Sequence, residues 1–431
     1  SNTTGGTAFF MAIGHPAAAE PAAALAARLA LAGPVALYDP LGVAASFAEI
    51  HPLDGVDLAG VYVQKIEDVG KPVLGHAAQP VTELPASGAK LVFLVAFDAD
   101  KPASHIAHLI PEGAELVTLD AMRLPDRLLT KPDKYLDPLN FATNFAFFRD
   151  GGGHHTRLTT ANYWARYGDG PVTLHAWLFD EAGAVSAQWD QPAPDGVGSI
   201  AIDSREVRAR FGLPGFAGQL FLHAVGARGH DVVKYALDTY GDGDDVLSCT
   251  HDANAWPADL YAGLRAPEAG EQVGLWIQNS HPCPIPANGV GLNRMGDEAV
   301  VWLDQEIPAF GSYPLDVAEL LPETRWPDQI EVQAGKYFVR PRYEVTAASG
   351  RSRIAHVNVE RTDLAPDPRI AELSNLVGKG YVLPAPVLPL DTMRSSLLPT
   401  PMSTAQTTLP LALKIYDAGG REMHTERLGC L

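Results

Sequence analysis

Cysteine is scarce in this chain of 431 residues. The three cysteines form an odd, sparse set, which excludes a disulfide framework and indicates a cytoplasmic protein.

Basic runs are also missing, and the chain has 32 Lys and Arg and 51 Asp and Glu, which gives a formal net charge of -19. Such a surface repels phosphate backbones and anionic membranes, so we expect no nucleic-acid partner.

Long apolar runs are absent as well. No stretch reaches the roughly 20 uninterrupted apolar residues that span a bilayer, so we expect no membrane span. The first residues lack a basic segment, and Gly14, His15 and Pro16 interrupt the early apolar run, which predicts no signal peptide, although a removed one would leave no trace. The hydrophobic content of 46% is that of a folded protein, with room for about three domains.

Residues 1–138 alternate apolar runs with alanine-rich segments, the pattern of a parallel sheet covered by helices on both faces. We predict a Rossmann-like α/β domain with a helix between Pro16 and Gly33. The expected strands lie in residues 7–14, 35–39, 58–64, 90–98 and 114–120.

Two residues of this domain are candidates for cofactor binding. Gly14 ends the first expected strand, and Asp39 ends the second, where a dinucleotide fold places the acid that holds a ribose. The segment reads G-H-P-A-A-A, without the later glycines of G-x-G-x-x-G that let a backbone approach a pyrophosphate. A ligand site and a purely structural domain therefore both stay open.

A family resemblance accompanies this pattern. G-V-Y-V-Q, the turn G-K-P-V-L-G from Gly70 to Gly75, and K-L-V-F-L-V-A-F-D-A-D resemble the small Rossmann-like domain at the front of sugar acyltransferases. The family's acidic residues after the first of these strands are replaced by Gln64 and Lys65, and no hexapeptide repeat follows. The resemblance implies a fold and not an activity.

From about residue 140 the chain shows short alternating strands between Gly, Pro and Asp turns, which predicts antiparallel β-sandwiches. The sequence is also duplicated at an offset of 113 residues, because Trp189, Gly198-Ser199, Asp203 and Glu206 fall on Trp302, Gly311-Ser312, Asp316 and Glu319. We assign one β-sandwich repeat to residues 152–265 and a second to 270–380. Shared residues indicate structure, so we expect both tryptophans in the core, with stacking on sugar rings as the alternative.

Residues 381–431 read as a proline-rich linker and the start of a third, incomplete repeat. Asp417 precedes a glycine turn as Asp180 does in the first repeat, which predicts a tight hairpin. An incomplete sandwich exposes strand edges. These strands therefore either complete another sheet or belong to a fragment of a longer protein.

Three further segments could carry chemistry. Cys249, His251, His281 and Cys283 form a mirrored pair of C-x-H and H-x-C, which could bind zinc tetrahedrally or simply be buried. The acidic segment 238–245 resembles a calcium loop but lacks its order, and a hairpin turn explains it better. The segment G-G-G-H-H-T at 151–156 reads as a linker between domains.

The sandwich pattern, an Asn-containing strand, a D-x-x-G hairpin and G-S-x-x-[IL]-D, resembles the small sandwiches of the sensory rhodopsin transducer family. This resemblance implies a homo-oligomer and a carbohydrate-like or protein ligand. We therefore expect a non-enzymatic binding or assembly protein. The alternative is an enzyme of carbohydrate or nucleotide metabolism that uses the N-terminal crevice, with Asp39, Asp98 and His105 or His108 nearby.

Overall fold

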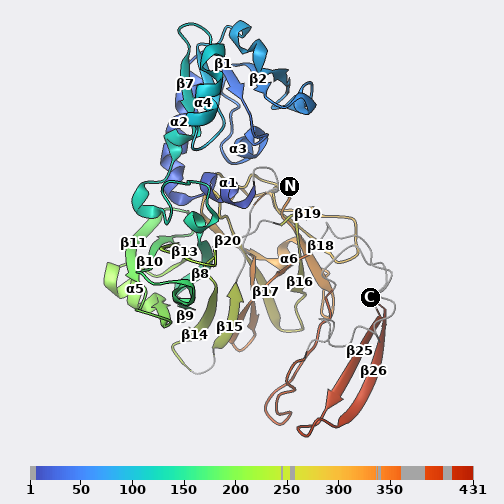
Figure 1. Ribbon diagram of the computed structural model, residues 1–431. Helices are drawn as coiled ribbons and strands as arrows, with labels where there is room; N and C mark the ends of the chain where they lie inside the picture. The colour runs from blue at the N-terminus through green and yellow to red at the C-terminus, as the bar shows by residue number, and fades with distance from the viewer. Residues whose placement is uncertain are drawn as a thin grey trace.

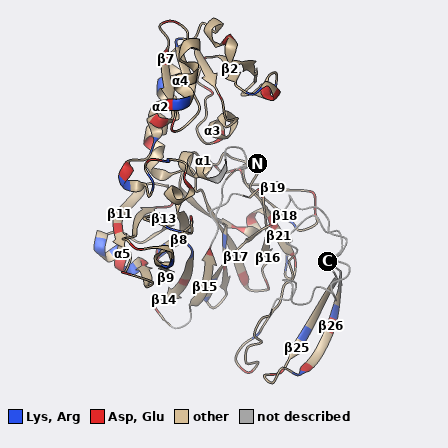
Figure 2. Cartoon of the chain, viewed as in Figure 1, with Lys and Arg blue, Asp and Glu red and all other residues tan. Residues whose placement is uncertain are grey.

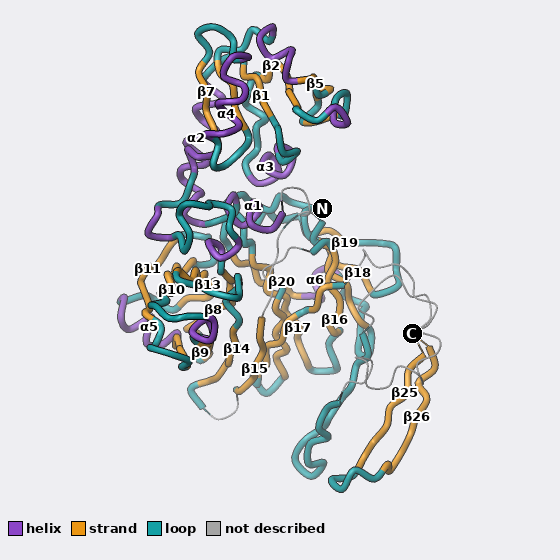
Figure 3. The backbone as a smooth tube through the Cα atoms, viewed as in Figure 1, coloured by secondary structure: helices purple, strands orange, loops and turns teal. Residues whose placement is uncertain are grey.

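The computed structural model describes residues 6–243, 246–252, 258–335, 337, 341–360, 384–400 and 410–430. The protein is rich in β-structure, and its strands form several separate sheets (Figure 1). Most of the helical turns belong to the N-terminal part, as Figure 3 shows. Among the helices of the described ranges, none has the length and apolar character that crossing a membrane requires.

The N-terminal part contains a five-stranded parallel sheet with the order β5-β2-β1-β6-β7. Its central strands are fully buried apolar runs, because helices and turns cover both faces. The strands are β1 (Val35–Tyr38), β2 (Leu58–Val63), β5 (Gln79–Pro80), β6 (Leu91–Leu94) and β7 (Glu115–Thr118), with a small hairpin of β3 (Pro72–Val73) and β4 (His76–Ala77). The helices are α2 (Ala19–Leu31), α3 (Ala44–Ile50) and α4 (Asp100–Ile106).

The expected first strand is wrong. Residues Gly6–Ile13 form the helix α1, which lies between the parallel sheet and the β-rich body (Figure 1). A short run of apolar residues does not distinguish a strand from a buried helix, so the sequence 7–14 was compatible with both. In the structure the buried residues Phe9, Ala12 and Ile13 have the three- and four-residue spacing of one helix face. The other four expected strands are confirmed, as is the helix that ends before Gly33.

The first β-unit follows directly. It contains β8 (Thr143–Gly151), β9 (His154–Ala161), β10 (Thr173–Phe179), β11 (Val185–Pro192), β12 (Ser199–Asp203), α5 (Ser204–Phe211), β13 (Phe216–Val225), β14 (Tyr235–Gly241) and β15 (Leu247–Asp252). Strands β8 and β9 pair at only two positions, so the sheet folds into two layers, β11-β10-β13-β8 and β12-β9-β14-β15. Leu158, Leu174, Leu220 and Leu237, from both layers, share one apolar core.

The second β-unit repeats this topology strand for strand. Its sheets are β19-β18-β21-β16, extended by β24, and β20-β17-β22-β23. The elements are β16 (Leu260–Arg265), β17 (Glu271–Gln278), β18 (Gly291–Arg294), β19 (Val301–Trp302), β20 (Ser312–Asp316), α6 (Val317–Leu320), β21 (Gln329–Gln333), β22 (Arg342–Ala347), β23 (Ser352–His356) and β24 (Asn358–Val359). The sequence duplication is therefore a duplication of fold.

The duplicated residues hold the same backbone geometry in both units. The backbone N–H of Asn162 donates to the carbonyl of Gly198 at 2.8 Å, and that of Asn279 donates to the carbonyl of Gly311 at 2.9 Å. The side-chain amide of each asparagine also donates to a proline carbonyl at 2.9 Å, Pro194 in the first unit and Pro308 in the second. The tryptophans differ. Trp189 is buried in the first core, whereas Trp302 is 43% exposed on β19, so the expectation of two core anchors is wrong for Trp302.

Asp203 and Asp316 both cap the short helix that follows, since Oδ1 of each accepts a backbone N–H at 3.0 Å. We expect Asp316→Ala to lower the free energy of unfolding by about 1 kcal/mol, the usual cost of a lost cap. Asp203→Ala should cost more, because Asp203 also accepts hydrogen bonds from Tyr240 and the charged Arg157, whereas Asp316 accepts one further bond, from the exposed Gln272. Urea denaturation of the two variants tests this, and an equal or larger loss in Asp316→Ala would contradict it.

The strand pairing moves two boundaries within the repeats. Strand β8 lies before the expected start at residue 152 but pairs with β13 of the first unit. Strand β16 lies before the expected end at residue 265 but pairs with β21 of the second unit.

The segment 151–156 is the hairpin between β8 and β9 and not a linker between domains. The acidic segment 238–245 joins β14 to β15 as the expected hairpin, although residues 244 and 245 lie outside the described ranges.

The remaining described chain has two parts, a segment that contacts the second unit and a hairpin that projects away from it. Residues 384–400, here called the strap, have no helix or strand and are largely exposed, as the prolines predicted. Strands β25 (Pro410–Tyr416) and β26 (Glu422–Cys430) form a separate hairpin that projects from the body (Figure 1). Its turn matches that of β10 and β11, because Asp417 Oδ1 accepts the N–H of Arg421 and Asp180 Oδ1 that of Ala184, both at 2.9 Å. The tight hairpin is confirmed.

Candidate binding site

The carboxyl edge of the parallel sheet does not present the expected cofactor residues to a ligand. Asp39 follows β1 and is buried, and its two carboxylate oxygens accept the backbone N–H groups of Val43 (2.9 Å) and Ala44 (3.0 Å) at the start of α3. Burial raises the pKa of Asp39, and these hydrogen bonds oppose that rise. Asp39 is therefore used to cap a helix.

Gly14 has a different position from the one expected. It follows the helix α1, and a Cβ added to it would lie 3.2 Å from the carbonyl oxygen of Phe10. It borders a cavity of about 20 Å³ between α1 and the β-units, which has room for roughly one water molecule. Gly14 is thus not in a strand-to-helix turn that could hold a phosphate.

The crevice residues of the enzyme hypothesis are also separated. Asp98 follows β6, pairs with Arg123 at 2.5 Å and accepts the backbone N–H of Tyr135 at 3.0 Å, so residues of the protein fill this edge. His105 and His108 lie at the end of α4 and in the turn after it. A crossover helix runs back along the sheet, which places both histidines toward the opposite edge from Asp39 and Asp98.

The two Cys and His pairs lie in different places. Cys249 and His251 lie on β15, where the His251 ring is 4.9 Å from that of His356. His281 and Cys283 follow β17, beside Phe10 of α1 and the backbone of Glu49. Within the described ranges, which include all four, no three His, Cys, Asp or Glu side chains are arranged to hold a metal ion. Burial also raises the pKa of the Cys249 thiol, which disfavours the thiolate that zinc requires.

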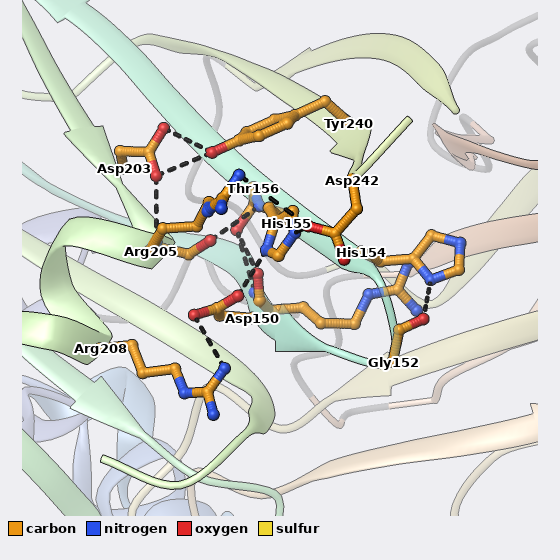
Figure 4. A network of polar contacts seen from close by, with 12 residues as sticks. Asp150, Gly152, His154, His155, Thr156, Asp203, Arg205, Arg208, Tyr240 and Asp242 are labelled. Atoms are coloured by element: carbon orange, nitrogen blue, oxygen red, sulfur yellow. Dashed lines mark hydrogen bonds and ion pairs between the residues drawn. The ribbon is translucent and has the colours of Figure 1, made fainter. Parts of the chain in front are cut away.

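A histidine with two carboxylates distinguishes the first unit from the second. His155 Nδ1 is 2.5 Å from Asp150 Oδ1, and Nε2 is 2.9 Å from Asp242 Oδ1 (Figure 4). The pairing of β17 with β20 places Gln272 at the equivalent position of the second unit. Both ring nitrogens of His155 are engaged, so neither is left to act as a base, and the cluster fixes the β8–β9 hairpin to the β14–β15 turn.

A groove of about 970 Å³ lies between the second unit and the strap. This volume lies at the upper end of the range of small-molecule sites. Hydrogen bonds join the strap to the second unit. Arg394 donates to both carboxylate oxygens of Glu268, at 2.7 and 2.8 Å, Thr400 donates to Gln329 at 2.7 Å, and Gln329 donates to the carbonyl of Pro399. We refer to this recess as the strap groove.

The charge of the strap groove is opposite to that of the chain. Among the described residues, its lining contains one acidic residue, Glu268, and four arginines, Arg265, Arg351, Arg353 and Arg394. Figure 2 shows basic and acidic residues interspersed along the chain, so the excess is local to the groove. Glu271, just behind the lining, pairs with Arg265 and Arg353.

The protonation states of the groove follow from its contacts. Burial alone would raise the pKa of Glu271, but hydrogen bonds from the Glu268 backbone and from Arg353 lower it. The hydrogen bond to Glu268 raises the pKa of Arg394. Burial lowers the pKa of His356, and the charge of Arg342 adds to that effect. At neutral pH Glu271 and Arg394 are therefore charged and His356 is neutral.

Aromatic and uncharged polar groups complete the lining. The Arg265 guanidinium lies 4.8 Å from the centre of the Trp326 ring, and Tyr343 lines the groove nearby. Hydroxyl and amide side chains also line the groove: Ser349, Ser352, Asn358, Thr392 and Ser396. The lining thus combines ring faces with directional hydrogen-bonding groups.

Sequence reasoning did not identify these arginines, because it searched for a basic run. Arg353 lies on β23 and Arg351 directly precedes it, and the two arginines alternate with the buried Ser352 and Ile354, which favours one side of the sheet for both. This R-x-R spacing was a readable signal. The contribution of Arg394 was not readable, since only the folded chain brings the strap to Glu268.

Comparisons with known proteins give no family. No family model matches the chain, and neither does any curated protein. A solved structure described as a putative beta-galactosidase from Bacteroides fragilis is similar over 52% of this chain and 33% of its own, with 10% identity and a TM-score of 0.14. A biofilm-associated protein BSP domain is similar over 70% of this chain and 74% of its own, with 10% identity and a TM-score of 0.15. The chain spans about a third of the length of the first of these.

Proposed function

We propose that this chain is a non-enzymatic binding protein that takes its ligand in the strap groove. The observation that carries the proposal is the groove itself, about 970 Å³ with an excess of arginine in a chain of net charge -19. Small-molecule sites are clefts of about 300 to 1,000 Å³ in which a few polar groups converge, and the volume of this groove lies within that range. The duplicated β-units serve as the rigid support.

The N-terminal part has a supporting role in this proposal. The parallel strand order β5-β2-β1-β6-β7 supports a Rossmann-like domain, since in chain order it reads 3-2-1-4-5. Asp39 and Asp98 are engaged by backbone and side-chain groups of the protein at its carboxyl edge. We therefore assign this domain to structure, and we place the binding function in the second unit.

Narrowing the strap groove tests the proposal. Thr392 is an exposed strap residue that lines the groove, and Thr392→Trp should weaken ligand binding roughly tenfold or more because the indole ring occupies part of the space that the ligand needs. Thr425→Trp on the projecting hairpin is a matched control that should leave binding unchanged. Isothermal titration with a neutral cello-oligosaccharide, an oligogalacturonate and an oligoglutamate peptide provides the measurement. Binding of none of these probes, or binding that Thr392→Trp leaves intact, would contradict the proposed site.

A further inference from the structure

We infer that the projecting hairpin of β25 and β26 is a dimerisation element, in which β25 pairs antiparallel with β25 of a second copy of this chain. Neither the strap groove nor its ligand takes part, so this interface is independent of the proposed function. Three features of the hairpin support the pairing: its likeness to a hairpin of the first unit, the difference between its two edges, and the sequence of β25.

The first unit shows which edge of such a hairpin takes a partner. Strands β10 and β25 both have seven residues, and each ends one residue before the aspartate of its turn. Strand β10 pairs with β11 through one edge and with β13, antiparallel over all seven residues, through the other. Among the described residues, β25 pairs with β26 alone. The edge of β25 that corresponds to the β13 side of β10 is therefore the one suited to a further strand.

The hairpin also carries apolar residues of the kind that pack in the first unit. Counted back from the turn aspartate, three apolar residues of β25 occupy the positions of three residues of β10 that lie in the core of the first unit: Leu411, Leu413 and Ile415 match Leu174, Ala176 and Leu178. Ile415 is 37% exposed, because the hairpin projects from the body (Figure 1). Two strands alone are marginally stable in water, and independent stability requires three or more. An additional strand beside β25 would meet that requirement.

The two edges of the hairpin are not equivalent. The register leaves Met423 and Leu428 as extra residues, and both belong to β26. Bulges of this kind bend a strand and protect its outer edge from pairing. In the first unit the extra residue Ser186 lies on β11 at the position that matches Met423, and β11 is the end strand of its sheet. Strand β25 has no extra residue, so its edge is regular over its whole length.

The sequence of β25 fits a second copy of itself. A two-fold axis at Leu413 places Leu413 opposite Leu413 of the second copy and Leu411 opposite Ile415, so apolar residues meet apolar residues. Lys414, the one charged residue of β25, then lies opposite Ala412 and meets no like charge. Its ammonium already pairs with a carboxylate of β26 at 3.0 Å. The contact closes as a symmetric dimer, because the bulged β26 of each copy forms the two ends of the combined sheet.

Sedimentation equilibrium of the full chain tests this pairing. We expect the wild-type chain to form a dimer, and Leu413→Lys and Leu413→Glu each to weaken dimerisation roughly tenfold or more, since like charges would face each other across the axis. An equimolar mixture of the two variants should restore the dimer, because a lysine then faces a glutamate. The matched control His424→Lys adds a charge on β26, where residue 424 pairs with Ile415, and should dimerise as the wild type does.

The mixture separates a broken contact from a misfolded hairpin, because mixing two chains does not repair a damaged strand. A wild-type chain that stays monomeric up to roughly 100 µM would overturn the inference. A dimer that both charged variants leave intact would use another surface and would overturn it as well. If each variant is monomeric and the mixture is monomeric too, Leu413 does not face its own copy, and β25 serves a different strand or none.

Discussion

Lowering the pH from 7.5 to 5.0 is expected to reduce the free energy of unfolding by about 2 kcal/mol for each histidine that folding keeps neutral. Two such histidines face each other where the N-terminal segment meets the first unit. His15 Nε2 lies 2.7 Å from His223 Nδ1, and both side chains are buried. Trp177 and Phe221 surround the His15 ring. The pair should therefore contribute about 4 kcal/mol of acid sensitivity.

The hydrogen bonds fix the protonation of this pair. His15 Nδ1 accepts the N–H of Ala17 at 3.0 Å, so its proton is on Nε2 and is donated to His223. Burial lowers the pKa of His15 well below its ordinary value, and it lowers the pKa of His223 to about 3, with the charge of the nearby His175 adding to both effects. His175 itself pairs with Asp190 at 2.6 Å.

The direction of the pH effect follows from these shifts. The unfolded histidines take up protons near pH 6.5, whereas the folded pair stays neutral, so the unfolded state gains stability as the pH falls. The contribution of the pair is complete above about pH 6.5. It is lost progressively as the pH falls toward the folded pKa of His223, about 3.

Urea denaturation at the two pH values provides the measurement. His223→Gln keeps an acceptor for His15 and should remove about 2 kcal/mol of the pH dependence. His424→Gln, on the exposed hairpin, is the matched control and should leave the pH dependence unchanged. A pH dependence that is the same in His223→Gln and in the wild type would show that this pair does not carry the effect.

Glu344→Ala is expected to destabilise the protein by about 3 to 5 kcal/mol, because it leaves a buried arginine without its partner. Arg149 of β8 and Glu344 of β22 form a bidentate pair across the two units, with both distances 3.0 Å and both side chains 12% exposed. Trp276 and Ser352 also donate to Glu344. Burial alone would raise the pKa of Glu344, but Arg149 and these donors lower it, so the carboxylate is charged.

Two comparisons isolate the buried charge as the cause. Glu319→Ala, an exposed glutamate of α6, should change the free energy of unfolding by no more than about 0.5 kcal/mol. Removing both charges in Arg149→Leu/Glu344→Leu should recover most of the loss, since no unpaired ion is left behind. A single-variant loss below about 1 kcal/mol, or a double variant weaker than Glu344→Ala, would contradict this role.

The repeated part of the fold was the most readable from the sequence. Trp189, Asp203 and Gly198 recur at one spacing, and the units they mark have the same strand order. The exact boundaries were not readable, because β8 and β16 carry none of the duplicated residues. The helix α1 was also not readable, since its identity depends on packing Phe9 and Ile13 against two other parts of the chain.

The candidate sites were harder to predict than the fold. Asp39 has the position of a ribose-binding acid, but the need to cap α3 uses its oxygens, and sequence spacing does not distinguish the two roles. The four Cys and His residues were grouped by pattern, whereas the strands carry Cys249 and His281 to different places. The strap groove unites Arg353 and Arg394, which lie on separate segments, so only tertiary structure shows it.

A crystal structure of the full chain with the tightest-binding of the three titrated probes bound tests the central claim most directly. We predict the probe between the strap and strands β22 and β23, in contact with lining residues such as Arg353, Arg394 and Trp326. A probe bound at the edge of the parallel sheet near Asp39, or a strap groove that stays empty at saturating probe, would contradict the account.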